Sequence, residues 1–538
     1  MNHFVEVDRV EYSSTGYFSR LVADYLSGKE TLRDYYVHPA SLDGIIASIN
    51  ARKAFDTKRD LLVKQLQQQY EGIQLNERQY HNLQSLLSND TFTITTAHQP
   101  NIFTGPLFFI YKIIHVIKLA DELKTTLPHF NFVPIYYMGS EDADLDELGY
   151  INLGGDKLIW NTNQTGAVGR MFVDKDLLNL IHRIEGQVGV YPFGNDLIRL
   201  FLGCYTIGKS IQQATLELVN ALFASFGLLV VIPDNRALKS SFHSVIEKEL
   251  IEQFSFKAVT RTIEDLSKNY KVQTGGRELN LFYLIGDKRD RIQLIEVGNE
   301  NERRYSIPDI EKVWTIDEIL KELSDNPERF SANVTLRGVF QETILPNIAF
   351  VGGGGELAYW LELKEVFNAV DVPYPVIILR NSFLLISNKE RIKLDKLGLN
   401  SEDLFLSEFD LVKKIVKDSS ANNLSLSSEI AAVIEIYQRI KGTASNIDSS
   451  LLQHVDYLEK SAIQRLVELE KKFLRSEKRK FGEKKGQISS FKKALFPNDN
   501  LQERIDNFSL YLAREGFGWL QFIYDHSEGL EQRFSILK

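Results

Sequence analysis

The pattern of hydrophobic and polar positions first becomes distinctive in residues 91–123, where it predicts a strand, a tight loop and a helix. Phe92 and Ile94 alternate with threonines, as is typical of a pleated strand. The loop that follows contains a proline, which removes a backbone donor and ends the strand, and Pro106 stands where a helix accepts proline, at its first position. Nearly every residue from 107 to 123 is apolar, so we expect this helix to be buried on most sides.

Further apolar runs predict more strands of the same sheet. They cover residues 130–138, 228–232, 347–351 and 375–386, and each is apolar over almost its whole length, which is typical of a parallel strand covered on both faces. The second run follows a helical pattern that stops at a glycine, as in a βαβ unit. The pattern therefore predicts an α/β fold with a parallel sheet.

The chain of 538 residues is longer than a single hydrophobic core needs, so we expect several domains. These are a helical N-terminal cover, a Rossmann-like core with two insertions, a helical coiled-coil arm and a C-terminal segment docked on the core. The expected bounds are 1–89 for the cover, 90–387 for the core, about 153–209 and 239–330 for the insertions, 388–500 for the arm and 501–538 for the last segment.

Within the arm, apolar residues recur at spacings of three and four on both sides of residues 446–450. The rhythm slips at Asp448, a natural helix cap. We therefore favour two helices folded as an antiparallel hairpin over one continuous rod with a stutter. Such a projecting hairpin most often serves dimerisation.

Composition narrows the class of protein. A net charge of −9 and a pI near 5.7 argue against a general nucleic-acid binder. A single cysteine, Cys204, excludes an intrachain disulfide and a multi-cysteine metal site. No secretion signal and no run of about 18 apolar residues is evident, so we expect a cytoplasmic protein without a membrane partner.

Candidate binding residues follow the first strand. In open α/β sheets, ligands bind at the loops after the carboxyl ends of the strands. The loop after the first strand offers polar side chains and free amides at Gln99, Asn101, Thr104 and Gly105. An ordinary strand–turn–helix without a ligand is the alternative.

An acidic run follows the second strand. Residues 141–147 contain five carboxylates, which repel one another unless cations or amines are present. At the end of an apolar strand they are candidates for binding Mg²⁺ or an ammonium, or for general base catalysis, with solvated surface acids as the alternative. We predict Glu141, Asp142 and Asp144 as the catalytic residues.

A third group of candidates surrounds a glycine tetrad, Gly352, Gly353, Gly354 and Gly355, between a strand and a helix. Its amides could approach an anion, although it lacks the Lys-Ser/Thr pair of a phosphate loop and the dinucleotide spacing; a tight turn is the alternative. Arginine suits carboxylate or phosphate, and charge inside an apolar run needs a partner. The remaining predicted binding residues are Arg337, Gln341, Glu356, Tyr359, Arg380 and Ser382.

Five segments in this order carry a family resemblance: TGPLFFIYK (104–112), SEDADLDE (140–147), NVTLRGVFQETILPN (333–347), VGGGGELAYW (351–360) and LFPNDNLQERIDNF (495–508). With these segments the chain resembles the bacillithiol synthase family, cysteine ligases that add cysteine to glucosaminyl-malate. The resemblance implies a nucleotidyltransferase-like Rossmann core with connecting-peptide insertions, a coiled-coil arm that pairs two subunits, and bacillithiol as the product.

The chain departs from the family pattern at two positions. Ala143 stands where the family usually has a histidine in the acidic motif, and Gly354 stands where it usually has a proline in the glycine loop. Ala143 indicates that a histidine there is not indispensable. His98 is not a residue expected throughout the family, which argues against a catalytic role for it.

The resemblance also implies chemistry. Amide formation from a free carboxylate is uphill, so we expect ATP, with Mg²⁺ as a further expectation, to activate cysteine as an acyl-phosphate or an adenylate. Arg337 and Arg380 would bind the malyl carboxylates, and the acidic residues would bind the amine or remove its proton. Another small-molecule nucleotidyltransferase and a non-catalytic coiled-coil scaffold are the alternatives.

Overall fold

The computed structural model describes residues 6–272, 275–297, 302–419, 425–480 and 482–538. The described chain divides into two units, one of residues 9–384 and 501–535 and one of residues 6–8, 385–500 and 536–538. The chain passes between the units within three short strands, β1 (Val7–Val10), β15 (Phe383–Leu385) and β16 (Phe534–Leu537), and a fourth time between residues 500 and 501.

A five-stranded parallel sheet forms the centre of the first unit, in the order β14-β13-β2-β3-β6. The strands are β2 (Thr91–His98), β3 (Asn131–Met138), β6 (Leu229–Val231), β13 (Asn347–Gly352) and β14 (Val376–Leu379). The chain runs outward from β2 through β3 to β6, then returns to the other side of β2 for β13 and β14. The strand order therefore reverses between β2 and β13, and this is where open α/β sheets bind ligands.

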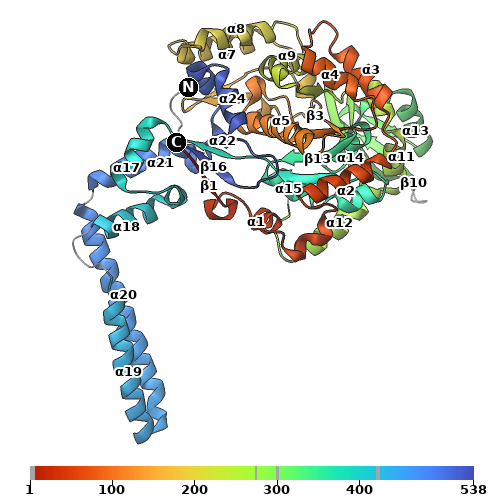
Figure 1. The fold of residues 1–538 in the computed structure, drawn as a ribbon. Helices are drawn as coiled ribbons and strands as arrows, with labels where there is room; N and C mark the ends of the chain where they lie inside the picture. The colour runs from red at the N-terminus through yellow and green to blue at the C-terminus, as the bar shows by residue number, and fades with distance from the viewer. Residues whose placement is uncertain (1–5, 273–274, 298–301, 420–424, 481) are drawn as a thin grey trace. The chain divides into compact units, whose positions relative to one another are not determined.

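The predicted α/β fold is confirmed. Helix α5 (Phe108–Thr126) packs on β2 and β3, and α2 (Leu42–Lys53) packs on β13 and β14. Figure 1 shows α5 on one side of the sheet and α2 and α15 (Gly354–Trp360) on the other. Every strand of the sheet is almost wholly buried, which explains why continuous apolar runs marked these strands in the sequence.

Two predicted elements are wrong in detail. A single helix was expected after the glycine tetrad, but two short ones occur, α15 (Gly354–Trp360) and α16 (Lys364–Asn368). The apolar run 375–386 is two strands, because buried Arg380, Asn381 and Ser382 separate β14 from β15 and form side-chain hydrogen bonds there. A polar triplet inside an apolar run ends the strand when its groups find buried partners.

The remaining elements of the first unit surround the sheet. The N-terminal helices are α1 (Arg20–Leu26), α2, α3 (Arg59–Gln69) and α4 (Glu77–Ser85). Between β3 and β6 lie α6 (Leu145–Leu148), β4 (Tyr150–Leu153), β5 (Asp156–Ile159), α7 (Lys175–Val188), α8 (Gly194–Cys204) and α9 (Ile211–Phe223). Three short helices follow residue 500: α22 (Gln502–Ile505), α23 (Ser509–Glu515) and α24 (Gly518–Asp525).

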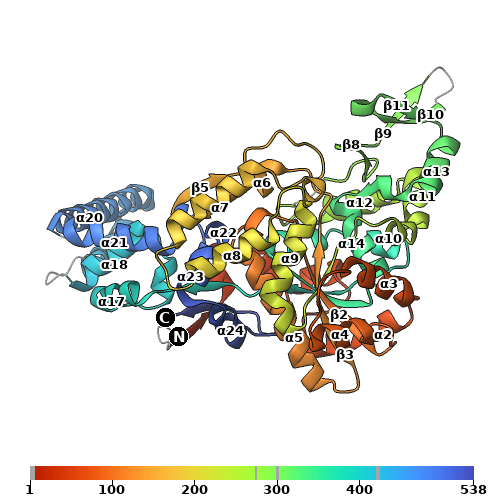
Figure 2. The same cartoon turned by 90° about the horizontal axis from the view of Figure 1, so that it is seen from above.

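Between β6 and β13 the chain makes a mixed insertion. It contains α10 (Arg236–Ser240), α11 (His243–Glu252), α12 (Phe254–Leu266), α13 (Ile316–Asp325), α14 (Val334–Ile344), β7 (Leu281–Ile285), β8 (Lys288–Arg291), β9 (Gln293–Val297), β10 (Glu302–Ile307), β11 (Lys312–Trp314) and β12 (Phe330–Ala332). Strands β12-β7-β8 form one antiparallel sheet and β11-β10-β9 another. Figure 2 shows the second sheet at one edge of the unit, away from the central strands.

The second unit is helical, with α17 (Asn388–Leu397), α18 (Glu408–Ser419), α19 (Ser427–Ile447), α20 (Leu452–Lys480) and α21 (Gly482–Leu495). Helices α19 and α20 pair as an antiparallel hairpin, as predicted (Figure 1). Asp448 ends α19, and its side chain accepts a hydrogen bond from the Ser450 amide at 2.8 Å. Lys441 joins the two helices through Asp456, at 2.7 Å, and Glu459. Among the described residues, no helix has both the length and the apolar character that crossing a membrane requires.

Candidate functional site

A cavity of about 640 Å³ opens in the first unit at the carboxyl ends of β2, β3, β13 and β14. It therefore lies where the strand order reverses. Its lining residues are Ala97, His98, Gln99, Phe108, Lys112, Gly139, Asp142, Glu147, Val334, Arg337, Gly353, Gly354, Gly355, Glu356, Tyr359, Arg380 and Arg504. Each of the strands contributes through the loop that follows it, as the fold class predicts.

The cavity brings together about half of the residues predicted from sequence. The predicted residues that line it are Gln99, Asp142, Arg337, Gly353, Gly354, Gly355, Glu356, Tyr359 and Arg380. Those that do not line it are Asn101, Thr104, Gly105, Glu141, Asp144, Gln341, Gly352 and Ser382.

Asp142 defines one side of the cavity. Its Oδ2 accepts from Gln99 Nε2 at 3.2 Å and from Arg337 Nη2 at 3.5 Å, and its Oδ1 accepts from the Ala143 amide at 2.9 Å. Burial alone raises the pKa of Asp142, but the charges of Arg337 and Arg289 and the hydrogen bonds outweigh burial and leave that pKa below its ordinary value. Asp142 is therefore a carboxylate at neutral pH.

The other two acidic residues predicted as catalytic have different partners. Glu141 pairs with the buried Lys239, which also donates to the Glu328 carbonyl at 2.8 Å. Asp144 caps the short helix α6 by accepting from the Glu147 amide at 3.1 Å. Cations and amides thus relieve the repulsion expected for this acidic run. Asp142 is the member of the predicted catalytic trio that lines the cavity.

Lys112 and Glu356 form an ion pair on the opposite side. Lys112 is 3% exposed, and its Nζ also donates to the Ala97 carbonyl at 3.0 Å, at the end of β2. Glu356 in turn accepts from the Gly353 amide at 2.9 Å. Lys112 was not among the residues predicted from sequence, although it is a charge within an apolar helix and, like Arg380, needs a partner there.

Arg380 reaches the cavity from the loop after β14. Its Nη1 and Nη2 donate to Glu503 Oε2 and Oε1 at 2.9 and 2.6 Å, and Ser382 Oγ donates to the same carboxylate at 3.1 Å. Its Nε is buried without a hydrogen-bond partner and lies 3.6 Å from the position of a Cβ built on Gly353. The Nε of this guanidinium is therefore a buried donor that remains for a ligand.

His98 is also part of the wall. Its Nε2 is buried without a hydrogen-bond partner, and the rings of Phe108 and Phe109 pack against its imidazole. Burial holds the pKa of His98 well below its ordinary value, with the charges of Lys112 and Arg380 acting in the same direction. The imidazole is neutral at pH 7.

The other predicted residues take part in the surrounding structure. Thr104 and Gly105 have positive φ, and Asn507 Nδ2 holds this turn through the Phe103 carbonyl at 2.9 Å. Asn101 is buried beside it, with its Nδ2 3.5 Å from the Glu147 carbonyl. The Gly352 carbonyl accepts from the Arg380 amide at 2.8 Å, and Gln341 donates to the buried Glu342 at 2.9 Å.

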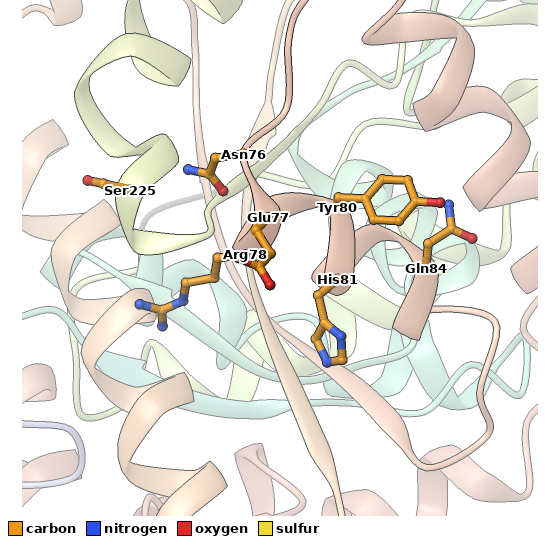
Figure 3. Close-up of a pocket in the computed structure, with 7 residues that line it drawn as sticks. All are labelled: Asn76, Glu77, Arg78, Tyr80, His81, Gln84 and Ser225. Atoms are coloured by element: carbon orange, nitrogen blue, oxygen red, sulfur yellow. The ribbon is translucent and has the colours of Figure 1, made fainter.

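A second hollow, of about 660 Å³, lies along α4 and is lined by Asn76, Glu77, Arg78, Tyr80, His81, Gln84 and Ser225 (Figure 3). All but Ser225 come from this helix and its cap, and Arg78 is already paired with Asp121. This hollow is not at the ends of the strands. Within the described ranges, no group of three or more His, Cys, Asp or Glu side chains could hold a metal ion.

The fold and the cavity define a Rossmann-like α/β protein with a C-terminal coiled-coil domain. Two family models match the chain: "Bacillithiol biosynthesis BshC, N-terminal Rossmann-like domain" over residues 5–381 and "Bacillithiol biosynthesis BshC, C-terminal coiled-coil domain" over residues 383–538. The chain belongs to the BshC family of bacillithiol biosynthesis.

Similar proteins cover the whole length of the chain. Proteins of Flavobacterium johnsoniae and Flavobacterium psychrophilum are both 38% identical, covering 98% and 99% of this chain and 99% of each relative. A protein of Christiangramia forsetii is 36% identical over 98% of each chain. All three carry the name "Putative cysteine ligase BshC".

Proposed function

We propose that this protein is a cysteine ligase that forms bacillithiol by joining the carboxyl group of cysteine to the amine of glucosaminyl-malate. Membership of the BshC family and the names of the relatives support the reaction class. The observation that carries the proposal for this site is the cavity itself, where a carboxylate (Asp142) faces a cationic and amide-rich wall at the reversal of the strand order.

Asp142 has the acid–base role in this proposal. The amine of the sugar arrives as an ammonium, which binds a carboxylate and must lose a proton before its nitrogen attacks. Gln99 and Arg337 fix the carboxylate in place, and its Oδ2 is the oxygen that they share. Glu141 and Asp144 support the acidic loop through Lys239 and the cap of α6, so their part in the reaction is to position Asp142.

The opposite wall suits a phosphate-bearing ligand. Lys112, the Nε of Arg380 and the backbone of the glycine loop surround it, and Arg504 adds a further cation at the cavity. The unpartnered buried Nε of Arg380 fits an oxygen-rich anion, because a buried donor without an acceptor is costly. We therefore propose ATP as the activating co-substrate: it supplies a phosphoryl or adenylyl group that makes the cysteine carboxyl reactive. Mg²⁺ would accompany its phosphates.

The proposal also covers the oligomeric state and the cellular location of the protein. Both helices of the hairpin expose large apolar side chains, among them Ile436 and Ile440 on α19 and Tyr457 on α20, with exposed fractions of 44%, 44% and 68%. A second copy of this chain would cover them, so we propose a homodimer formed through the arm. We also propose a cytoplasmic protein whose partners are small molecules and neither nucleic acid nor membrane.

The test is mass spectrometry of a reaction with purified protein, glucosaminyl-malate, cysteine and Mg-ATP. We expect a bacillithiol peak that requires both protein and ATP. Asp142→Asn should abolish most of the product, whereas Asp146→Asn, at an exposed acid on the adjoining helix α6, should not. Absence of product together with absence of binding to all three substrates would refute the ligase and favour a scaffold. AMP or CMP transfer to one substrate without bacillithiol would favour a different nucleotidyltransferase.

A further inference from the structure

The hairpin β7–β8 carries an arginine whose guanidinium has no polar partner. Arg289 stacks on Phe282, with its guanidinium carbon 3.6 Å from the ring centroid. Its Nε is a buried donor without an acceptor, and among the described residues none forms a hydrogen bond or an ion pair with the side chain of Arg289. Stacking on an aromatic face holds a guanidinium flat while leaving its edge available for a planar anion.

The hairpin is connected to the acidic loop of the cavity. Asp287, at the tip of the hairpin, lies against Gly166, where a side chain would collide with the Asp287 carbonyl, and Thr165 Oγ1 donates to that carbonyl at 3.4 Å. Two residues further along the same segment, the Val168 amide donates to the Asp142 carbonyl at 2.8 Å. The two insertions thus hold the hairpin beside Asp142.

Two arginine charges act on Asp142 at this side of the cavity, one from Arg337 in the cavity lining and one from Arg289, which is outside that lining. Glu141 is occupied by Lys239, which leaves Asp142 as the acid that faces two arginines, Arg289 and Arg337. Arg337 is only 3.5 Å from Asp142, at the limit of a hydrogen bond. Burial and the charge of Arg337 lower the pKa of Arg289 to about 10, so it still carries its charge at neutral pH. Two guanidinium charges therefore face the carboxylate of Asp142.

We propose that Arg289 and Arg337 together bind the dicarboxylate group of the substrate, which on the proposed function is the malyl group of glucosaminyl-malate. The amine and the malyl group stand on adjacent carbons of the sugar ring, so a substrate whose amine binds Asp142 places its carboxylates beside the arginines next to Asp142. Arg380 is already bound through Nη1 and Nη2 to Glu503, so its charge is compensated and it is less suited to a second carboxylate. Arg289 thus determines specificity for an acidic group on the amine substrate.

The test is isothermal titration of the full-length protein with glucosaminyl-malate, with malate alone and with ATP. Arg289→Gln should weaken binding of glucosaminyl-malate and malate about 10- to 100-fold, because it removes a charge-assisted bidentate contact, and should leave ATP binding unchanged. Arg289→Lys keeps the positive charge but cannot form the bidentate contact. Its affinity for glucosaminyl-malate should therefore lie between those of wild type and Arg289→Gln. Arg291→Gln is the matched control. Arg291 lies on β8 like Arg289, and its guanidinium carbon is 4.5 Å from the centroid of the same Phe282 ring.

Three results would overturn the inference. They are equal affinity of wild type and Arg289→Gln for glucosaminyl-malate, equal weakening by Arg291→Gln, and a loss of ATP binding instead of malate binding in Arg289→Gln. These measurements need no turnover. A wild-type protein that binds malate through Arg289 but transfers AMP or CMP to a substrate without forming bacillithiol would contradict the proposed ligase and leave this assignment intact.

Discussion

Arg380 and Glu503 meet as a bidentate pair inside the first unit, with Nη1–Oε2 and Nη2–Oε1 distances of 2.9 and 2.6 Å and side-chain exposures of 5% and 0%. The two residues are 123 positions apart in the chain. The pair ties the segment after residue 500 to the loop after β14, and thereby to the wall of the cavity. A buried pair of this kind contributes little net stability against an apolar replacement, but removing one partner leaves an uncompensated charge.

Glu503→Gln should therefore lower the free energy of unfolding by about 3–5 kcal/mol. Urea denaturation measures this change in the free energy of unfolding. Asp90→Asn is the control, because it breaks the exposed ion pair with Lys53 and should cost less than about 1 kcal/mol. A loss for Glu503→Gln no larger than that of the control would show that water reaches Arg380.

Lys112→Met should impair the phosphate side of the cavity without changing its volume much. We expect ATP affinity to fall about 10- to 100-fold, since a charged donor 3% exposed is lost. Lys118→Met, on the same helix but with Glu122 3.9 Å away, should bind ATP as wild type does. Fluorescence titration with an ATP analogue compares the two variants; equal affinities would remove Lys112 from the proposed site.

Burial of Lys492 in the second unit should make the free energy of unfolding depend on pH. Burial lowers its pKa from the ordinary 10.5 to about 8, and its Nζ donates to the Leu404 carbonyl at 2.7 Å. Between pH 8 and 10.5 the unfolded chain holds this proton and the folded chain does not, so stability rises with pH across that window. The rise should be on the order of 2 kcal/mol.

The measurement is the difference in urea stability between wild type and Lys492→Met at pH 7.5 and at pH 9.5. The difference cancels the titration of the tyrosines and other groups. We expect the wild type to gain on the variant as the pH increases. A pH-independent difference would mean that Lys492 keeps its proton in the folded state.

The helical hairpin of α19 and α20 allows a test of the proposed homodimer. On the proposed homodimer, Ile440→Glu, at a position 44% exposed on α19, should convert dimer to monomer in light scattering, because a charge would be buried in the interface. Glu435→Lys on the same helix serves as a charge-change control. If wild type is already monomeric at micromolar concentration, or if Ile440→Glu remains a dimer, this face is not the interface.

The sequence predicted the sheet well because its strands are buried on both faces, and such strands are apolar throughout. It also predicted the break at Asp448, since a cap residue and a change of rhythm coincide there. It did not predict which partners the side chains of Glu141, Asp142 and Asp144 bind. These neighbours diverge because Lys239 pairs with the first, Arg337 faces the second and an amide of α6 binds the third.

Residues whose role depends on distant partners were the hardest to find. Glu503 gave no signal because its partner lies 123 residues away, and Arg289 lies in a stretch where no chemistry was recognised. Lys112 was visible as an isolated charge in an apolar helix. The local pattern identifies a loop at the end of a strand, whereas the pairing between loops is fixed by the topology of the sheet.

The reversal of the strand order also determines when the site can exist during synthesis. Asp142 and Arg337 are separated by 195 residues, and Arg380 has no carboxylate partner until Glu503 has been synthesised. As the chain leaves the ribosome, β2, β3 and β6 can pair early, but the pocket has no second wall until β13 and β14 dock beside β2. The nascent protein therefore carries an open sheet edge at β2 until β13 is made, and a chain released before residue 503 would have Arg380 without its carboxylate.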